Sequence, residues 1–344
     1  MPRRDMDNVK MKKQAKLGHD KTERHQRNAG AEPRQEGTLV GKDGAGIGLV
    51  VGHEQSLPSE IAFPLVTPKL HVARGNVLDQ IHWLHDHQFP HKFRLIYCDP
   101  PFYSKRDYGA FSDQWSSLET YLEEMRRWIE AFYPWVDDHG FFVLHCDYHA
   151  SHYLKVMADR IFGYDNFRNE WIWHYSGRRQ PASLRVNSKH DVLLVWAKSS
   201  EARFTPVFEA WDRDRYITMK RQKVHRDEDG REWIWGHQGK GKSHAYRIYL
   251  DEHIERGRAI DTVWDIPIIN TSAKERVGYP TQKPVALLNR VIELTTQPGD
   301  WVADFAAGSG TTGVAAGELG RACWLGDVNG EAIESMLQRL SVSE

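Results

Sequence analysis

The sequence predicts an α/β fold in which a mostly parallel sheet is covered by helices on both faces. Short segments rich in β-branched and aromatic residues indicate buried strands, and they alternate along the chain with helical patterns. Such alternation is typical of a parallel sheet. The expected strands cover residues 93–99, 140–147, 191–198, 301–305 and 321–327.

Two segments have the periodicity of amphipathic helices. In the first, residues 118–132, apolar side chains recur every three or four positions. Ser116 and Glu119 have the spacing of a capping box at its start, and Pro134 is expected to end it. The second helix is expected after Pro284.

Composition indicates a soluble globular protein. The chain has 344 residues, with 46 Lys and Arg against 47 Asp and Glu. It has no apolar run near the roughly 18 residues of a membrane helix, and its first residues lack the apolar stretch of a secretory signal. Cys98, Cys146 and Cys323 lie far apart in the sequence, which excludes a disulfide framework and favours a reducing cytoplasm.

The chain is expected to have four parts. Residues 1–60 begin with a basic, polar stretch and predict a flexible arm, which either touches nucleic acid or is simply solvated. Residues 61–200 and 265–344 carry the predicted strands and helices. Residues 201–264 lack a sustained period and hold many charged and aromatic residues, so we expect an inserted subdomain there.

A glycine-rich turn follows the strand at 301–305. Gly308, Gly310 and Gly313 have the G-x-G-x-x-G spacing, and Asp327 ends the next expected strand. Glycines allow close approach of a ligand to the backbone, and an acid at the second strand tip can accept ribose hydroxyls. Too little chain follows to complete a dehydrogenase sheet, so earlier strands must complete it in a permuted order.

The turn Asp99-Pro100-Pro101-Phe102 directly follows the strand that is expected to begin at residue 93. Two prolines fix the backbone, so a carboxylate and a rigid carbonyl stand side by side as acceptors for one amino group. Phe102 offers a surface on which a ring can stack. Because parallel sheets bind ligands at the carboxyl ends of their strands, this turn and the glycine loop are expected to share one crevice.

These motifs, in this order, resemble the β-class of DNA amino-methyltransferases. That family has an Asp/Asn/Ser-Pro-Pro-aromatic motif first, a target-recognition insertion next and an S-adenosylmethionine glycine loop last. Residues 265–313, with Tyr-Pro-Thr-Gln-Lys-Pro at 279–284, are similar to one continuous block of the family. The resemblance covers about 61–200 and 265–344, and it implies a permuted Rossmann-like methyltransferase sheet.

The resemblance also implies residue roles. Asp99 and the Pro100 carbonyl would accept the amino hydrogens of the target base, and Phe102 would stack on that base. Asp327 would bind the ribose hydroxyls of S-adenosylmethionine. The rest of the cofactor pocket would be formed by Asp304, Ala306, Gly308, Ser309, Gly310 and Thr311, with Thr281, Gln282 and Lys283 bordering the methionine end.

Two positions depart from the family pattern. Phe305-Ala306 stands where the family usually has Pro-Phe, and Gly75-Asn76 stands where it often has Gly-Asp. The adenine of the cofactor and an acidic contact near it are therefore expected to differ here.

The expected reaction is direct methyl transfer to the exocyclic N6 amine of adenine in double-stranded DNA, with the base flipped out of the helix. An aspartate at the first motif position favours adenine, and N4 of cytosine stays open. Methylation at cytosine C5 is disfavoured, since that chemistry needs a cysteine nucleophile and Cys98 precedes Asp99 within a strand.

The inserted segment is the expected reader of the DNA sequence, the alternative being a charged surface excursion with its own small core. Basic residues interleaved with aromatic ones offer phosphate and base contacts. The expected DNA-binding residues are Arg213, Arg215, Lys220, Arg221, Lys223, Arg226 and Arg231.

Other interpretations stay open. The glycine loop alone would also suit an NAD-dependent oxidoreductase, and the motifs alone would suit an RNA, protein or small-molecule methyltransferase or a DNA-binding regulator with a vestigial fold. His145, His149 and His152 invite a metal site, but no metal is expected because the chemistry needs none. The expected partners are DNA, a cognate restriction endonuclease and a second copy of the chain, with no membrane association.

Overall fold

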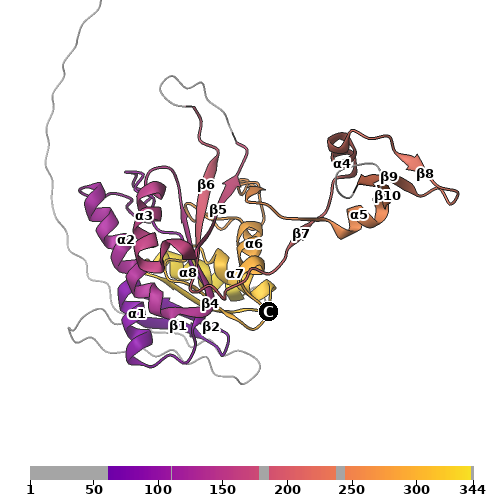
Figure 1. Ribbon diagram of the computed structural model, residues 1–344. Helices are drawn as coiled ribbons and strands as arrows, with labels where there is room; N and C mark the ends of the chain where they lie inside the picture. Colours follow the sequence, from indigo (N-terminus) through magenta and orange to yellow (C-terminus); the bar gives the residue numbers. More distant parts are fainter. Residues whose placement is uncertain (1–60, 110, 178–185, 238–244, 342–344) are drawn as a thin grey trace, which may run out of the picture. The chain divides into compact units, whose positions relative to one another are not determined.

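The computed structural model describes residues 61–109, 111–177, 186–237 and 245–341, so the predicted N-terminal arm lies outside the described residues. Within the described residues, the largest sheet has nine strands in the order β1-β2-β14-β13-β3-β4-β6-β5-β12 (Figure 1). These strands are β1 (Ala62–Val66), β2 (Leu70–Arg74), β3 (Phe93–Cys98), β4 (Val136–Cys146), β5 (Phe167–His174), β6 (His190–Ala197), β12 (Val263–Asp265), β13 (Trp301–Asp304) and β14 (Ala322–Asp327).

The predicted permuted, mostly parallel sheet is confirmed. Strands β2, β14, β13, β3 and β4 pair in parallel, whereas β6 is antiparallel to both of its neighbours. The two strands that come last in the sequence, β13 and β14, lie between β2 and β3. Chain segments about two hundred residues apart are therefore hydrogen-bonded neighbours at the middle of the sheet.

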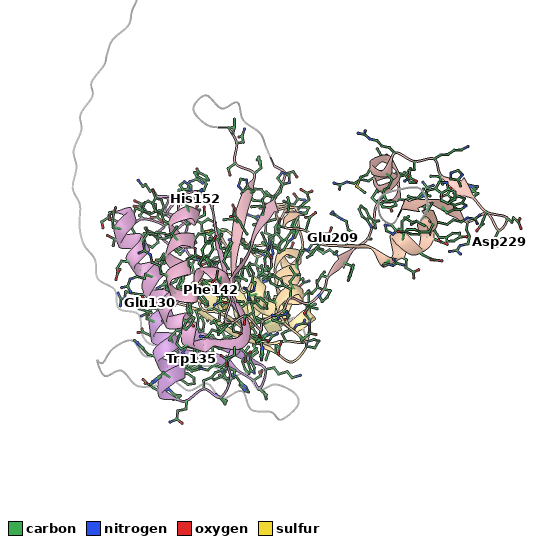
Figure 2. All side chains as sticks on the ribbon, in the orientation of Figure 1. Glu130, Trp135, Phe142, His152, Glu209 and Asp229 are labelled. Atoms are coloured by element: carbon green, nitrogen blue, oxygen red, sulfur yellow. The ribbon has the colours of Figure 1, made fainter. Side chains whose placement is uncertain are left out.

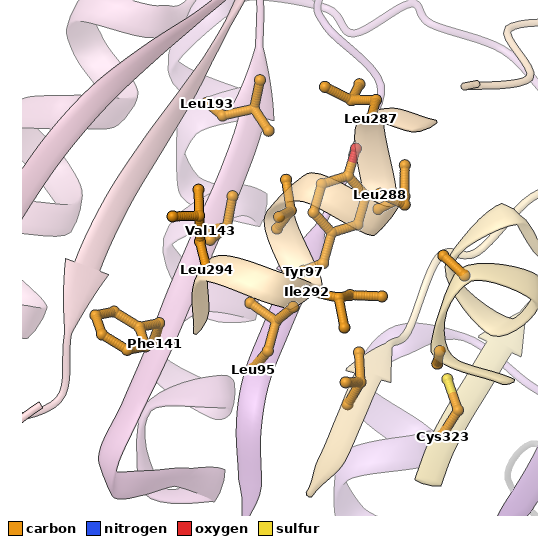
Figure 3. Close-up of a cluster of buried hydrophobic side chains, with 14 of the residues drawn as sticks. Leu95, Tyr97, Phe141, Val143, Leu193, Leu287, Leu288, Ile292, Leu294 and Cys323 are labelled. Atoms are coloured by element: carbon orange, nitrogen blue, oxygen red, sulfur yellow. The ribbon is translucent and has the colours of Figure 1, made fainter. Parts of the chain in front are cut away.

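Helices cover the sheet on both faces because successive strand residues point to opposite sides. In β3, Leu95 and Tyr97 enter one buried apolar cluster and Ile96 and Cys98 enter the other. Figure 3 shows the first cluster, in which Tyr97 packs beside Leu288. The helices on that side are α6 (Val285–Thr295), α7 (Thr311–Glu318) and α8 (Gly330–Ser341), and those on the other are α1 (Val77–Asp86), α2 (Leu118–Phe132) and α3 (Ser151–Phe162).

The predicted bounds of α2 and α6 are confirmed, but the predicted capping box is wrong by one residue. Ser117, not Ser116, caps α2, and its hydroxyl accepts the backbone N–H of Thr120 at 3.2 Å. The phase of the helix is set by the face that packs on the sheet, through Tyr121 and Met125, rather than by the Ser-x-x-Glu spacing. Pro134 lies in the short 3-10 helix η1 (Tyr133–Trp135) that follows; a second one, η2 (Tyr164–Asn166), follows α3.

Residues 208–259 form what we call the inserted module. The chain enters it through β7 and leaves it through β11, which pair antiparallel, and its own core is formed by Tyr216, Ile234 and Leu250. Figure 2 labels Glu209 in β7 and Asp229 in the turn between β8 and β9. The elements are β7 (Phe208–Glu209), α4 (Arg213–Lys220), β8 (His225–Arg226), β9 (Glu232–His237), β10 (Ala245–Tyr249), α5 (Leu250–Arg256) and β11 (Arg258–Ala259).

The residues on either side of this module belong to the main sheet and its core. Ala202 and Trp264 are buried in the cluster shown in Figure 3, and β12 pairs with β5. Across the described ranges, no helix combines the length and apolar character needed to cross a lipid bilayer. Cys98, Cys146 and Cys323 are buried free thiols.

Candidate active site

A single pocket of about 280 Å³ brings the Asp99 turn and the glycine loop together at the carboxyl ends of β3, β13 and β14. This volume is close to the lower end of the roughly 300–1,000 Å³ typical of small-molecule sites. Gly310 is the one predicted pocket residue that does not line it. The predicted residues that do are Asp99, Pro100, Pro101, Phe102, Thr281, Gln282, Lys283, Asp304, Ala306, Gly308, Ser309, Thr311 and Asp327.

The Asp99 turn is anchored to the helix layer, and its carboxylate lines the pocket. The buried hydroxyl of Tyr121 on α2 donates to the Pro101 carbonyl at 3.0 Å, which anchors the turn to the helix layer. The Asp99 side chain is 19% exposed; its Oδ2 pairs with Lys283, and its Oδ1 has no hydrogen-bond partner among the described residues. Because Oδ1 is itself buried, the carboxylate lines the pocket on the side that Lys283 pairs with.

The loop after Phe102 is organised by a buried aspartate that the sequence analysis missed. Asp113 accepts the backbone N–H groups of Tyr103 at 2.7 Å and Ser104 at 2.8 Å, and Tyr103 has a left-handed backbone. These bonds bring Tyr108 and Phe111, stacked at 5.0 Å, to the mouth of the pocket. No periodic or motif signal marks Asp113 in the sequence.

The glycine loop has the backbone geometry that its sequence predicts. Gly308 and Gly310 have φ values of 51° and 74°, which side chains rarely tolerate. A Cβ atom on Gly310 would lie 2.8 Å from Met336 of α8. The N–H of Gly308 donates to Oδ2 of Asp327 at 2.9 Å, so the loop and the tip of β14 form one unit.

Asp304, at the end of β13, is a buried carboxyl group. Its Oδ2 accepts the Thr312 hydroxyl at 2.6 Å and its Oδ1 accepts the Ala306 N–H at 3.2 Å. Burial, with a smaller contribution from the negative charge of Asp99, raises the pKa of Asp304 to about 7. Burial also raises the pKa of Asp327, whose two oxygens accept backbone N–H groups. Two carboxyl groups thus line a pocket suited to a cationic ligand.

The Thr281–Lys283 segment lies opposite, with different roles for its three side chains. Thr281 is exposed and has a left-handed backbone. The Gln282 amide is used within its own loop, where it accepts from Val277 N–H and donates to the Glu275 carbonyl. Lys283 extends to Asp99, and its carbonyl accepts the Thr311 hydroxyl at 3.1 Å.

A buried polar group behind Asp99 was not predicted in this role. His145 on β4 is fully buried, with Nδ1 2.7 Å from the Tyr97 hydroxyl and 3.7 Å from Oδ1 of Asp99. Its Nε2 lies 3.4 Å from Asp191. Burial would raise the pKa of Asp191, but His145, Lys283 and the Tyr175 hydroxyl together hold it below its ordinary value.

The other two histidines weighed for a metal site have different neighbours. His149 contacts Asp147 at 2.8 Å, and His152 contacts the Ser151 hydroxyl at 3.0 Å. The described ranges contain no group of three or more His, Cys, Asp or Glu side chains arranged to hold a metal ion.

Two further residues support the glycine loop from outside its motif. Gln80 of α1 is buried and donates to the Phe305 carbonyl at 3.0 Å, while its own oxygen accepts the Trp324 N–H. Arg339 of α8 donates to the Ser309 carbonyl at 2.9 Å. Neither was predicted, because each lies in a helix with an ordinary amphipathic pattern and contacts the loop only through the fold.

The pocket also accommodates the two departures noted in the sequence. Phe305 is buried and packs on Phe132 at 5.2 Å, so it is a core residue, while Ala306 lines the pocket. Asn76 lines the pocket as well and caps α1 by accepting the Asp79 N–H.

The basic residues predicted to bind DNA fall into two groups. Arg213 and Arg226 both pair with Glu232, and Arg231 pairs with Asp251 and Glu252. Within the described residues, the others are exposed and form no ion pair with an acidic side chain. This second group is Arg215, Lys220, Arg221 and Lys223.

Comparison with known proteins matches this chain to DNA methylases over most of its length. A family model described as DNA methylase matches residues 93–338. The type II methyltransferase M.HpaI of Haemophilus parainfluenzae is 28% identical over 246 residues, which is 72% of this chain and 67% of that protein. The DNA adenine methyltransferase YhdJ of Escherichia coli (strain K12) is 22% identical over 72% of this chain and 76% of its own length.

Solved structures share the fold at low sequence identity. The cytosine-N4-specific PvuII DNA methyltransferase has a TM-score of 0.51 and 15% identity, covering 79% of this chain and 86% of its own. The M1.HpyAVI-SAM complex has a TM-score of 0.50 and 18% identity, covering 79% of this chain and 98% of its own.

Proposed function

This chain belongs to the N6 and N4 DNA methylase family, and we propose that it methylates the N6 amine of adenine at specific sites in double-stranded DNA. The observation that carries this proposal is the shared pocket, in which the Asp99 carboxylate adjoins a glycine loop. One wall supplies acceptors for an amine, and the other is suited to a nucleoside-like methyl donor.

The donor is S-adenosylmethionine, which supplies an activated methyl group on a positively charged sulfur. The residues present fit this cation. Asp304 is a buried carboxyl group able to ionise near neutral pH, and Asp327 stands at the strand tip where ribose hydroxyls are accepted. The left-handed Gly308 lets the backbone approach the ligand closely.

Asp99 and Pro100 act on the acceptor amine. The lone pair of an exocyclic amine is delocalised into its ring, which makes the nitrogen a poor nucleophile. Hydrogen bonds from its two N–H groups to the Asp99 carboxylate and the Pro100 carbonyl favour a more tetrahedral nitrogen and localise the lone pair. Fixed acceptors also hold the nitrogen in line with the methyl group.

Phe102 stabilises the base outside the duplex. A base inside the stack cannot reach this crevice, so it must flip out at a cost of a few kcal/mol. Stacking on Phe102, at about 1–3 kcal/mol per base, offsets part of that cost. The ring lines the pocket beside the carboxylate.

Adenine is favoured over cytosine by the aspartate at the first motif position and by the relative named as an adenine methyltransferase. N4 of cytosine is the second candidate, because both amines present the same two hydrogens and a protein of the same fold is cytosine-N4-specific. Methylation at C5 has no support: burial raises the pKa of the Cys98 thiol well above its usual value.

The inserted module is proposed to read the DNA site. Its exposed basic segment, Arg215 to Lys223, offers charges that acidic neighbours do not neutralise, as phosphate contacts require. Arg213, Arg226 and Arg231 instead stabilise the module through their ion pairs. The protein is expected to act in the cytoplasm, as a dimer and beside a cognate restriction endonuclease.

Sequencing of DNA from cells that express the protein, with detection of modified bases, tests this proposal. We expect N6-methyladenine in one sequence context, absent from cells that express Asp99→Ala. N4-methylcytosine would select the second candidate. Unmodified DNA, with methylation of RNA or protein instead, would overturn the proposal, and reduction of NAD would indicate an oxidoreductase.

A further inference from the structure

The two oxygens of the Asp99 carboxylate have different surroundings. Oδ2 forms an ion pair with Nζ of Lys283. Oδ1 is buried, has no hydrogen-bond partner in the described part of the chain, and lies 3.7 Å from Nδ1 of His145. Oδ2 is therefore held by a cation, while Oδ1 is buried on the side of His145.

The main chain around Lys283 fixes where its ammonium group lies. The preceding Gln282 side chain bonds the Val277 N–H at 3.0 Å and the Glu275 carbonyl at 2.6 Å, which closes the loop. The Lys283 carbonyl accepts the Thr311 hydroxyl from the first turn of α7. With its side chain only 11% exposed, Lys283 is presented to Asp99 by the loop and is not a mobile surface residue.

Asp99 lies in a region with several other acidic side chains and tyrosine hydroxyls. Asp304 on β13 and Asp191 on β6 are buried or partly buried carboxyl groups that interact electrostatically with this region. The hydroxyls of Tyr97 and Tyr279 also face it, with pKa values raised first by burial and in part by the Asp99 charge. Lys283 supplies positive charge to this cluster directly, while His145 is charged only when protonated.

From this arrangement, which rests on the function proposed above, we propose that Lys283 is a positioning residue for methyl transfer. It holds Oδ2 and so fixes the orientation of the carboxylate, whose accessible side accepts the target amine. This role differs from the sequence-based expectation that Lys283 borders the methionine end of the cofactor.

The alternative is that Lys283 is a placeholder that the target amine displaces. Its Nζ lies 5.2 Å from the centre of the Phe102 ring, close to the surface on which the base is proposed to stack. The two roles make opposite predictions, because removing a placeholder strengthens DNA binding and leaves or raises the rate, whereas removing a positioning residue lowers the rate.

The test is the profile of single-turnover methyl transfer against duplex DNA and S-adenosylmethionine concentration for Lys283→Met and Lys283→Arg. A positioning residue acts on the reacting geometry, so its loss lowers the rate at saturation and not the affinities. We expect Lys283→Met to lose about 10- to 100-fold in the saturating rate, with dissociation constants close to those of the wild type. Lys283→Arg, which keeps a positive charge beside Asp99, is expected to recover most of that loss.

Lys155→Met is the matched control. Lys155 forms a partly buried ion pair with Asp159 on α3, at 2.6 Å and outside the pocket, so its loss is expected to leave the profile unchanged. Binding of S-adenosylmethionine, measured by calorimetry, reports that each variant is folded and separates a cofactor role from a positioning role. If Lys283→Met fails to fold, Lys283→Gln carries the same test.

An undiminished saturating rate in Lys283→Met, with or without a tighter DNA complex, or a rate loss fully explained by weaker cofactor binding would overturn the inference. The wild-type protein is measured first on duplex DNA. A wild type that transfers no methyl group to DNA contradicts the proposed function itself, whereas an active wild type with an insensitive Lys283 variant contradicts only this inference.

Discussion

The pocket and the inserted module handle charge in opposite ways. Around the pocket, Asp99, Asp304 and His145 are buried or nearly so, and their partners are fixed by the sheet and the helices on both faces. In the module, a core of three buried residues carries charged side chains that are mostly exposed. Burial gives each charged group of the pocket fixed partners, while exposure leaves the charges of the module available to a polyanion.

The difference teaches where substitutions should act. Under the proposed function, a change in the pocket is expected to alter transition-state stabilisation or the ionisation of a buried group, and its effect should appear in rates and pH profiles. A change in the module is expected to alter long-range attraction to phosphates, and its effect should appear in the salt dependence of binding.

The strongest challenge to this comparison is Asp99→Ala. Removing the acceptor of the amine is expected to lower single-turnover methyl transfer by about 10²- to 10³-fold, as loss of a charge-stabilising group in an active site commonly does. Duplex DNA affinity and S-adenosylmethionine affinity should change little, since both are supplied elsewhere. Rapid-quench assays with labelled cofactor, alongside filter binding, measure the two effects. An active Asp99→Ala enzyme would contradict the assigned chemistry.

A second variant tests the module. Replacing Arg215, Lys220, Arg221 and Lys223 by Ala should reduce the slope of log affinity against log salt by about three to four, at about 0.9 per phosphate contact. The matched control, Arg213→Ala with Arg226→Ala and Arg231→Ala, removes basic residues that pair with acidic neighbours. This control should lower the melting temperature and leave the salt slope close to that of the wild type. Equal slopes for both variants would show that the paired and unpaired groups do not differ in DNA binding.

The smallest expected effect is on cofactor binding at low pH. Since the pKa of Asp304 is raised to about 7 in the free protein, its carboxyl group is mostly protonated below that pH. A cationic ligand favours the ionised form, so the dissociation constant of S-adenosylmethionine should rise by up to about tenfold per unit as pH falls below 7. Asp304→Asn should bind weakly with a flatter profile. A wild-type affinity constant from pH 5.5 to 8 would remove the link to Asp304.

The sequence was sufficient to predict the parallel sheet, the permuted order and the two motif loops. Each depends on local signals: apolar strands, a fixed glycine spacing, and prolines that end β3. The order of the two loops along the chain, the Asp99 turn before the glycine loop, was a further signal for the permuted arrangement. These signals come from residues that are close together in the sequence, so they can be found without the structure.

The residues that were missed act through contacts that no sequence motif marks. Gln80 reaches the Phe305 carbonyl across more than two hundred residues of sequence, and Asp113 organises a loop through backbone N–H groups. Lys283 was expected to border the methionine end of the cofactor, which stays a prediction. Its ion pair with Asp99 could not be predicted, since that contact exists only once β3 and α6 are neighbours. The capping error at Ser116 has a similar origin, because core packing chose between two adjacent serines.

The strand order has a consequence for how the protein is made. Strand β3 emerges from the ribosome about two hundred residues before β13, which must insert between it and β14 beside β2. At typical synthesis rates of 5–20 residues per second, this leaves a delay of roughly 10–40 s in which the middle of the sheet has no partner. The methyl-transfer pocket can close only after translation has delivered the C-terminal segment, so chains released early would carry the Asp-Pro-Pro-Phe turn without any means of using it.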